Sequence, residues 1–373
     1  MKPLKGVRVV DFTTLLPGPL ATLILAEAGA EVYKIERPGG EDTRRSPPFI
    51  DNQSVMFAML NRGKRSIEIN IKEKIGLDRI INLIKRSDVV VDQFRPGVME
   101  RIGLGYNELK KIKPNIVHCS ITGYGQTGPK KYVAAHDINY MADSGLLSLA
   151  RNSDGAPAMP AAQIADIAGG SYPAVINILL ALRNAEKTGN GSYLDISMTD
   201  NLFPFMWIAL GIAYDNKNYP RGGDLRLTGA SPRYGIYRTL DSGFLALGAL
   251  EEKFWRRFCE VIELNENFVD DSKNPEKTKQ EVMKKVKAKN TSYWKTLLAN
   301  ETDICCSVVN SVEEALQDAQ VIERQLVAAS VNISEKNIKV MPTPLAPIWR
   351  PKTLLAGAPV LGEANSMLVS KNE

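Results

Sequence analysis

Three side chains that lie far apart in the sequence have the chemical types that proton transfer requires. His136, one of only two histidines, directly precedes Asp137 and follows a glycine-rich stretch at 123–129. Asp166 precedes a pair of glycines, and Glu251 follows the end of a hairpin pattern. A neutral imidazole can take a proton while a protonated carboxyl gives one. These residues could therefore invert a carbon atom if the fold brings them together.

Each of these side chains also has a purely structural interpretation. A lone histidine is more often a buried, hydrogen-bonded core residue, and His118, in the middle of a strand pattern, fits that description. Asp166 could be a helix N-cap, and Glu251 could be a solvated acid at a helix start. Residue types and spacing alone leave these alternatives open.

Several other chemistries lack their sequence motifs. Gly18 and Gly29 are the only glycines between Gly6 and Glu36, so the G-x-G-x-x-G turn of a dinucleotide site is missing, although Glu36 stands where a ribose-binding acid would stand. The chain also has no G-x-x-x-x-G-K-[ST] phosphate loop and no H-E-x-x-H metal pattern. We therefore expect no metal ion and no cofactor apart from the substrate.

The composition is that of an ordinary globular protein. The chain has 373 residues, of which 44% are hydrophobic and 24% charged. Its net charge of +5 is spread along the chain, which favours small anionic ligands weakly and gives little reason to expect nucleic acid. The four cysteines have no C-x-x-C spacing, and the N-terminal apolar run is too short for a secretory signal. No stretch approaches the ~20 apolar residues that a membrane span requires, so we expect a cytoplasmic protein with no membrane partner.

Alternating strand and helix patterns must position the candidate residues. The strand patterns lie at 6–12, 30–36, 88–92, 116–121 and 193–198. Helical spacing of apolar residues occurs between them, at 19–27, 77–84 and 170–183. This order predicts an α/β fold with a Rossmann-like, doubly wound, largely parallel sheet.

A second, smaller domain is expected after this sheet. A hairpin pattern spans 234–250, and lysine-rich helical segments fill 272–300. Four prolines after residue 341 indicate a linker that returns to the first domain. We assign the large domain to 1–200 and 345–373, the small α+β domain to 226–325, and the linkers to 201–225 and 326–344.

The chain is similar to a known family in five motifs and in the Asp166 and Glu251 segments that follow them in order. The motifs are L-K-G-V-R-V-V-D-F at 4–12, K-I-E-R-P-G-G at 34–40, L-N-R-G-K-R-S at 60–66, F-R-P-G-V at 94–98 and H-D-I-N-Y at 136–140. The chain resembles, nearly end to end, the α-methylacyl-CoA racemases of the class III CoA-transferase superfamily. The arginine-containing motifs occur across that superfamily, whereas the histidine of H-D-I-N-Y is typical of the racemase branch.

The resemblance implies a class III CoA-transferase fold and an interlocked homodimer with an active site shared between the chains. It implies that His136 and Asp166 are the two catalytic bases, and that Glu251 of the partner subunit lies near the histidine. The implied reaction interconverts (R)- and (S)-2-methylacyl-CoA thioesters through an enolate. We expect backbone N–H groups around Asp137 to meet the enolate charge.

Further residues are expected to bind the coenzyme A portion of the substrate. Guanidinium and ammonium groups suit phosphate anions, although each base taken singly could equally be an ordinary surface residue. The expected partners of the phosphates are Arg37, Lys64 and Arg95. On the resemblance alone, the residues that line the pantetheine channel are Tyr124, Gly125, Ala135, Asp137 and Tyr140.

Two alternative functions remain open. In a class III CoA-transferase, Asp166 would attack the thioester, form a mixed anhydride and then an aspartyl-CoA thioester, and pass CoA between carboxylic acids. That reaction needs neither His136 nor Glu251. A CoA-binding protein without catalysis would keep the basic residues but not the proton-transfer residues. The motifs are compatible with bile-acid, branched fatty acyl and other 2-methyl thioesters.

Overall fold

The computed structural model describes residues 2–152, 154–216 and 218–368, and the chain divides into two compact units. The first unit comprises Met1–Ser144, Pro160–Pro204 and Asp318–Glu373, and the second comprises Gly145–Met159 and Phe205–Gln317. The first unit is thus built from both ends of the chain. The second begins earlier than the expected 226 because helix α8 (Trp207–Asn216) packs with residues near 146–149 and Leu225 in one apolar cluster.

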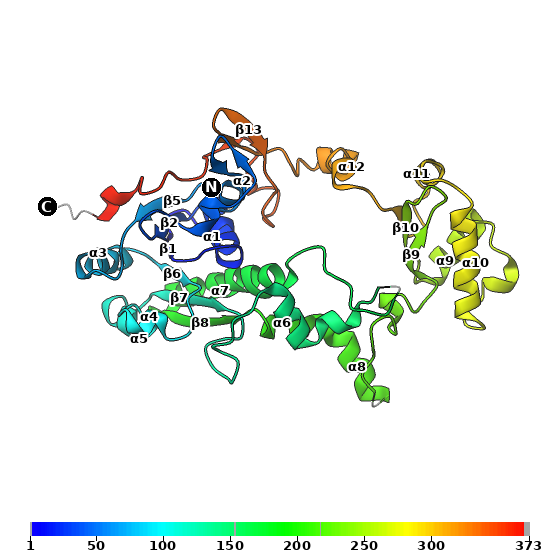
Figure 1. Cartoon of the computed structure of the whole chain (residues 1–373), viewed down its shortest axis with the longest axis horizontal. Coiled ribbons are helices and arrows are strands. Elements are labelled where there is room, and N and C mark those ends of the chain that lie inside the picture. The colour runs from blue at the N-terminus through cyan, green and yellow to red at the C-terminus, as the bar shows by residue number, and fades with distance from the viewer. Residues whose placement is uncertain (1, 153, 217, 369–373) are drawn as a thin grey trace. The chain divides into compact units, whose positions relative to one another are not determined.

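A six-stranded parallel sheet forms the centre of the first unit (Figure 1). Its strands are β1 Arg8–Asp11, β2 Glu31–Glu36, β5 Arg65–Glu68, β6 Val89–Asp92, β7 Val117–Thr122 and β8 Ser192–Ser197. They lie in the order β5-β2-β1-β6-β7-β8, and every neighbouring pair is parallel. Counted along the chain this is the order 3-2-1-4-5-6 of a doubly wound Rossmann sheet, which confirms the predicted α/β fold.

Helices pack on both faces of this sheet. The helices of this part of the first unit are α1 Pro17–Glu27, α2 Val55–Asn61, α3 Lys74–Ile84, α4 Val98–Arg101, α5 Tyr106–Ile112, α6 Asp137–Ser144, the π-helix Ala165–Ser171 and α7 Tyr172–Thr188. Helices α1 and α7 contact each other and the sheet (Figure 1). Because strand side chains alternate between faces, Val10, Tyr33 and Val90 point to the other face, where they form one core with residues of α3, α4 and α5.

The C-terminal part of the first unit returns to its N-terminal part. Two small sheets accompany this return: β3 Phe49–Ile50 with β4 Gln53–Ser54, and β12 Ser330–Ile333 with β13 Lys336–Lys339 and β14 Leu354–Leu355. The expected linker 326–344 therefore contains two strands. Thr343 donates to Glu27 at 2.6 Å, and Arg62 lies 2.7 Å from the same carboxylate. These buried contacts fasten the returning chain to α1.

The second unit combines a three-stranded antiparallel sheet with helices. Its elements after α8 are β9 Tyr234–Arg238, β10 Phe244–Gly248, α9 Glu252–Val261, α10 Pro275–Lys287, α11 Thr291–Leu298, β11 Cys306–Val308 and α12 Val312–Leu316, and a last short helix, α13 Ala319–Glu323, belongs to the first unit. Strands β9 and β10 form the expected hairpin. Tyr237, Leu245 and Leu247 point to one face, where they pack against Trp255 and Phe258 of α9.

One helical stretch, Ala165–Thr188, is long and apolar enough to cross a membrane by length and composition. The expectation that no segment reaches this threshold is therefore wrong. In the structure its α7 portion packs against β7, β8 and α1. A helix that covers a sheet in the core of a domain passes the same test, so this stretch is weak evidence for a membrane span.

Candidate active site

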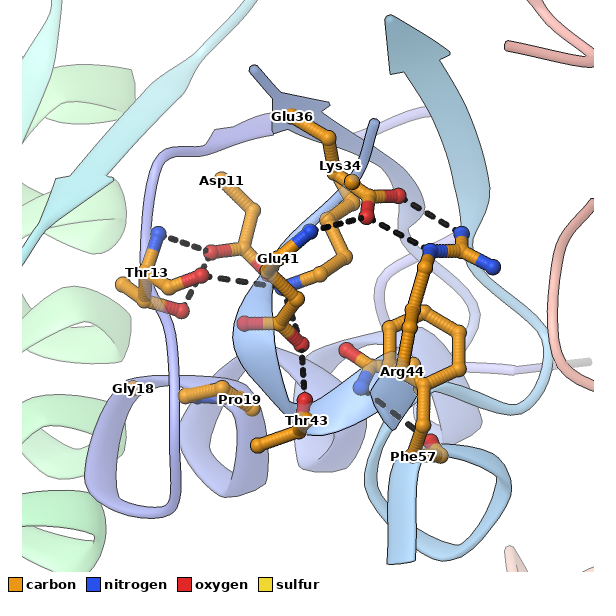
Figure 2. A network of polar contacts seen from close by, with 12 residues as sticks. Asp11, Thr13, Gly18, Pro19, Lys34, Glu36, Glu41, Thr43, Arg44 and Phe57 are labelled. Carbon is orange, nitrogen blue, oxygen red and sulfur yellow. Dashed lines mark hydrogen bonds and ion pairs between the residues drawn. The ribbon is translucent and has the colours of Figure 1, made fainter. Parts of the chain in front are cut away.

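The carboxyl end of β1 is occupied by buried charges (Figure 2). Asp11 is fully buried, and its carboxylate accepts hydrogen bonds from the backbone N–H of Thr13 at 2.9 Å and from the hydroxyl of Thr22 at 2.6 Å. Lys64 Nζ lies 3.1 Å from the same carboxylate. Burial is the largest influence on the pKa of Asp11 and raises it. The charges of Lys64 and Lys34 and the hydroxyls of Thr13 and Thr22 outweigh burial, so the pKa lies below its usual value.

The buried charges continue along β2. Lys34 Nζ donates to the Thr13 carbonyl at 2.9 Å and lies 3.3 Å from Glu41. Glu36 accepts two hydrogen bonds of 2.7 Å from Arg44, in the paired geometry of guanidinium and carboxylate (Figure 2). With Asp11 and Lys64, the cluster contains three acids and three bases. It is therefore neutral overall, as a buried charge cluster must be.

The start of α1 explains why this Rossmann sheet has no dinucleotide-type phosphate site. In dinucleotide folds, free N–H groups at the first helix start bind the pyrophosphate. Here Pro17 and Pro19 have no N–H, and Gly18 donates its N–H to Gln93 Oε1 at 3.0 Å. Two prolines and one occupied donor leave no cradle at this helix start.

Lys64 is not available to a phosphate, so its assignment as a coenzyme contact is wrong. Its ammonium group is fully buried and bonds Asp11, the Pro19 carbonyl, Thr22 and Asn61, at 2.7–3.1 Å. Burial is also the main reason that its pKa falls to about 8. Lys64 neutralises the Asp11 carboxylate and joins β5 to the end of β1.

Arg37 and Arg95 lie where a phosphate could reach them. Arg37 follows the carboxyl end of β2, and Arg95 follows that of β6, so the two residues belong to the strands on either side of β1. Both are exposed. Arg37 pairs with Asp42, whereas Arg95 has no ion-pair partner within the described part of the chain. Their role in binding coenzyme A stays a prediction.

His136 is held at the start of α6 by its backbone. Its carbonyl accepts the N–H groups of Asn139 at 2.8 Å and Tyr140 at 3.3 Å. Its own N–H donates to Asn139 Oδ1 at 3.0 Å. The residue is exposed, and no hydrogen bond to its imidazole is found among the residues that the structure describes. The ring is therefore free to exchange a proton with a ligand, unlike that of His118, which is buried and 2.8 Å from Asp92.

Two tyrosines support the loop that leads to His136. Tyr140 is only 6% exposed, and its hydroxyl donates to the Ala135 carbonyl at 2.8 Å. The Tyr140 side chain therefore supports the loop, and its expected place in the pantetheine channel stays a prediction. Tyr124 is half-buried, donates to Asp143 at 2.6 Å and meets the Tyr140 ring edge-on. Gly125 is buried beside it in the left-handed region, with φ of 79°.

Asp166 is the second residue of the π-helix, and the structure brings it together with Asp137 and His136. It is not the N-cap, a position that Ile164 occupies. Its backbone N–H donates to Asp137 Oδ1 at 2.9 Å. Burial, followed by the negative charge of Asp137, raises the pKa of Asp166 to about 6, while a protonated His136 lowers it. All three residues lie in the first unit.

The glycine pair after Asp166 has a packing role. A Cβ atom on Gly169 would lie 2.4 Å from the Met198 carbonyl oxygen, and one on Gly170 would lie 3.0 Å from the Met198 side chain. Only glycines let the π-helix approach the chain this closely after β8. Single π-helical turns occur frequently at functional sites. The sequence signalled this segment through its glycines but gave no sign of the π-helical winding.

The first turn of α6 presents two unoccupied backbone donors beside His136. Within the described ranges, the N–H groups of Asp137 and Ile138 have no hydrogen-bond acceptor. Such orphan donors at a helix start, together with the helix dipole, favour a negative charge. The expectation that N–H groups around Asp137 meet an enolate charge stays a prediction.

A family model described as CoA-transferase family III matches residues 4–365 of this chain. The chain belongs to CoA-transferase family III. It is therefore an enzyme of a family that acts on acyl-CoA. Curated relatives in this family divide between two reactions. The chain is 35% identical to "Succinyl-CoA:glutarate CoA-transferase" of Mus musculus, over 88% of this chain and 76% of the relative. It is 33% identical to "Alpha-methylacyl-CoA racemase" of Homo sapiens, over 92% and 86%.

A solved structure extends the family likeness to the whole fold. The crystal structure of Rv3272 from M. tuberculosis superposes with a TM-score of 0.84, at 26% identity and with 99% of both chains covered. The six-stranded parallel sheet with its smaller antiparallel sheets is thus the family III architecture.

Glu251 lies in the second unit of this family III chain, directly before α9. It occupies the N-cap position but makes no side-chain capping bond. It is exposed, and its carboxylate has no partner in the described part of the chain. Among the described residues, the local fold thus gives the Glu251 carboxylate no polar contact. That Glu251 of the partner subunit lies near His136 stays a prediction. Nor do the described residues contain a cluster of three or more His, Cys, Asp or Glu that could hold a metal.

Proposed function

We propose that this family III enzyme is a racemase that inverts the α-carbon of 2-methylacyl-CoA thioesters. The observation that carries the proposal is that Asp166 lies within reach of the charge of His136, while burial and Asp137 raise the pKa of Asp166 to about 6. A carboxyl with that pKa can hold or release a proton near neutral pH. An imidazole has the same property, so either residue can serve as acid or base.

The proposed reaction moves one proton at each face of the α-carbon. One residue removes the α-proton, and the C–H electron pair moves into the thioester to form an enolate. The N–H groups of Asp137 and Ile138 would stabilise the enolate oxygen. The second residue, which enters protonated, returns a proton to the opposite face. After one turnover His136 and Asp166 have exchanged protonation states, so the reverse reaction uses the same two residues.

The proposal includes a homodimer in which Glu251 of the partner subunit stabilises the protonated histidine. Exposed apolar side chains on two helices support it. Ile176 and Leu180 of α7 are 57% and 64% exposed, and Trp207 of α8 is 70% exposed. Ile176 and Leu180 are four residues apart and therefore lie on one face of α7, where a partner subunit would cover them. Light scattering should give the mass of two chains, and a monomer at micromolar concentration would remove this part of the proposal.

CoA transfer between carboxylic acids is the second candidate function. The 35% identity to a succinyl-CoA:glutarate CoA-transferase favours it. In that reaction Asp166 would attack the thioester as a nucleophile, and CoA would pass to and from its carboxyl group. The free imidazole of His136 and the two unoccupied N–H groups beside it have no assigned step in that scheme.

Isotope exchange separates the two reactions. The enzyme is incubated with (S)-2-methylacyl-CoA in heavy water, without and then with a free carboxylic acid, and NMR follows α-deuterium and the epimer ratio. A racemase gives deuterium uptake and converging epimers without added acid. A transferase moves CoA to the added acid and leaves the α-hydrogen untouched. His136→Gln should abolish exchange but keep CoA binding, and retained exchange would refute the assigned role.

A further inference from the structure

The Asp137 carboxylate contacts the segment that carries Asp166. Its Oδ1 accepts the Asp166 backbone N–H at 2.9 Å. Asp137 begins α6, Asp166 lies in the first turn of the π-helix, and these two elements pack against each other. An N–H group in the first turn of a helix has no acceptor within that helix. Asp137 supplies the acceptor and thereby fixes Asp166 relative to α6 and His136.

The same carboxylate influences the charge of Asp166. Among the described residues, the charges that act on Asp166 are those of Asp137, which raises its pKa, and His136, which lowers it. Helices α1 and α7 and strand β8 also pack against the π-helix, but none of their charges is a cause of the shift. Tyr140 of α6 responds to both carboxylates, because burial and then their charges raise its pKa to about 12.

We propose that Asp137 is a positioning residue that anchors Asp166 through its backbone N–H and sets a negative charge beside the Asp166 carboxyl. Asp137 itself need not touch the reacting atoms with its side chain. The catalytic consequence rests on the proposed racemase function. In that reaction the charge of Asp137 would make Asp166 a proton donor at a higher pH than an isolated carboxyl.

The test measures the protonation of Asp166 directly. Carbon-13 is introduced at the aspartate carboxyl groups, and the Asp166 signal is identified by its loss in Asp166→Asn. The pH titration of that signal is compared in the wild type and in Asp137→Asn, which keeps the acceptor oxygen and removes the charge. We expect the Asp166 midpoint to fall by on the order of one pH unit. The matched control is Asp78→Asn, an exposed acid of α3, which should leave the midpoint unchanged.

Kinetics provide a second readout that a merely structural role would not move. In Asp137→Asn the acid limb of the pH profile for α-proton exchange should shift downward by the same interval, whereas the loss of a merely structural contact would lower kcat without moving that limb. Asp137→Ser, which also keeps an acceptor oxygen, should reproduce the shift and replaces Asp137→Asn if that variant does not fold.

An unchanged Asp166 midpoint in both variants would overturn the proposal. So would a midpoint that moves only when the acceptor is removed, as in Asp137→Ala, because the charge would then have no effect. The proposed racemase function fails separately. If the wild type exchanges no α-hydrogen, that function is wrong, while the titration still decides the role of Asp137.

Discussion

Asp166→Asn should make the folded protein more stable at neutral pH although it removes a reacting group. Burial and the charge of Asp137 raise the pKa of this carboxyl from 3.8 to about 6 in the folded chain. A raised carboxyl pKa means that the fold resists ionisation of the group. This cost is absent well below pH 3.8, grows between pH 3.8 and about 6, and is fully present above that range. Replacing the carboxyl with a neutral amide removes the cost.

The size of the stability gain in Asp166→Asn follows from the pKa shift of Asp166. Two pKa units correspond to about 3 kcal/mol, at about 1.4 kcal/mol per unit. Because Asp166 is only half-buried, solvent screening reduces the expected gain to about 1–2 kcal/mol. For a chain of this length that gain raises the melting temperature by a few degrees.

Calorimetry at two pH values tests this reasoning. Asp166→Asn should melt higher than the wild type at pH 7.5 and nearly with it at pH 4. Asp78→Asn, which removes an exposed acid, serves as the control for the change in net charge. An equal gain at both pH values would mean that packing, and not ionisation, causes it. A loss of stability at pH 7.5 would refute the electrostatic account of the site.

Three further predictions concern other parts of the first unit. Lys64→Met should destabilise the fold by about 3–5 kcal/mol, measured by urea unfolding, because it leaves the Asp11 carboxylate buried without its cation. Arg95→Gln should weaken CoA binding several-fold in calorimetry without lowering the melting temperature, since Arg95 is exposed; unchanged binding would remove it from the phosphate contacts. Gly191→Ala should prevent soluble expression, because its Cβ would lie 1.9 Å from the Ile116 carbonyl oxygen, and a normally folded variant would contradict that packing.

The sequence predicted the parallel sheet because its strands are short apolar runs with helical spacing between them. Right-handed connections restrict the strand order without choosing it, and β5 at Arg65–Glu68 was not among the expected strands. The second unit was placed too late, because α8 is apolar on all sides and its residues showed no helical period.

Individual site residues were harder to predict than the fold. A motif shows that Lys64 is a base but not that it is buried. It was therefore assigned to a phosphate, although its ammonium group forms a buried ion pair with Asp11. Burial depends on contacts between distant segments, so the motif also did not show that Tyr140 is buried with its hydroxyl on the Ala135 carbonyl. The hydrogen bond from Asp166 to Asp137 spans 29 residues and depends on π-helical winding, which has no sequence period of its own.

The return of the C-terminal segment has a consequence for folding during synthesis. Ala364 and Leu368 complete the core beneath α3, and Thr343 closes the contact with Glu27 of α1. At bacterial or eukaryotic elongation rates of about 5–20 residues per second, the ribosome adds these residues roughly 10–30 s after β8 has emerged. During that time one face of the sheet is incompletely covered. The second unit is nearly continuous in sequence and can already fold. Chaperones that bind nascent chains should therefore protect the first-made half of this protein longest.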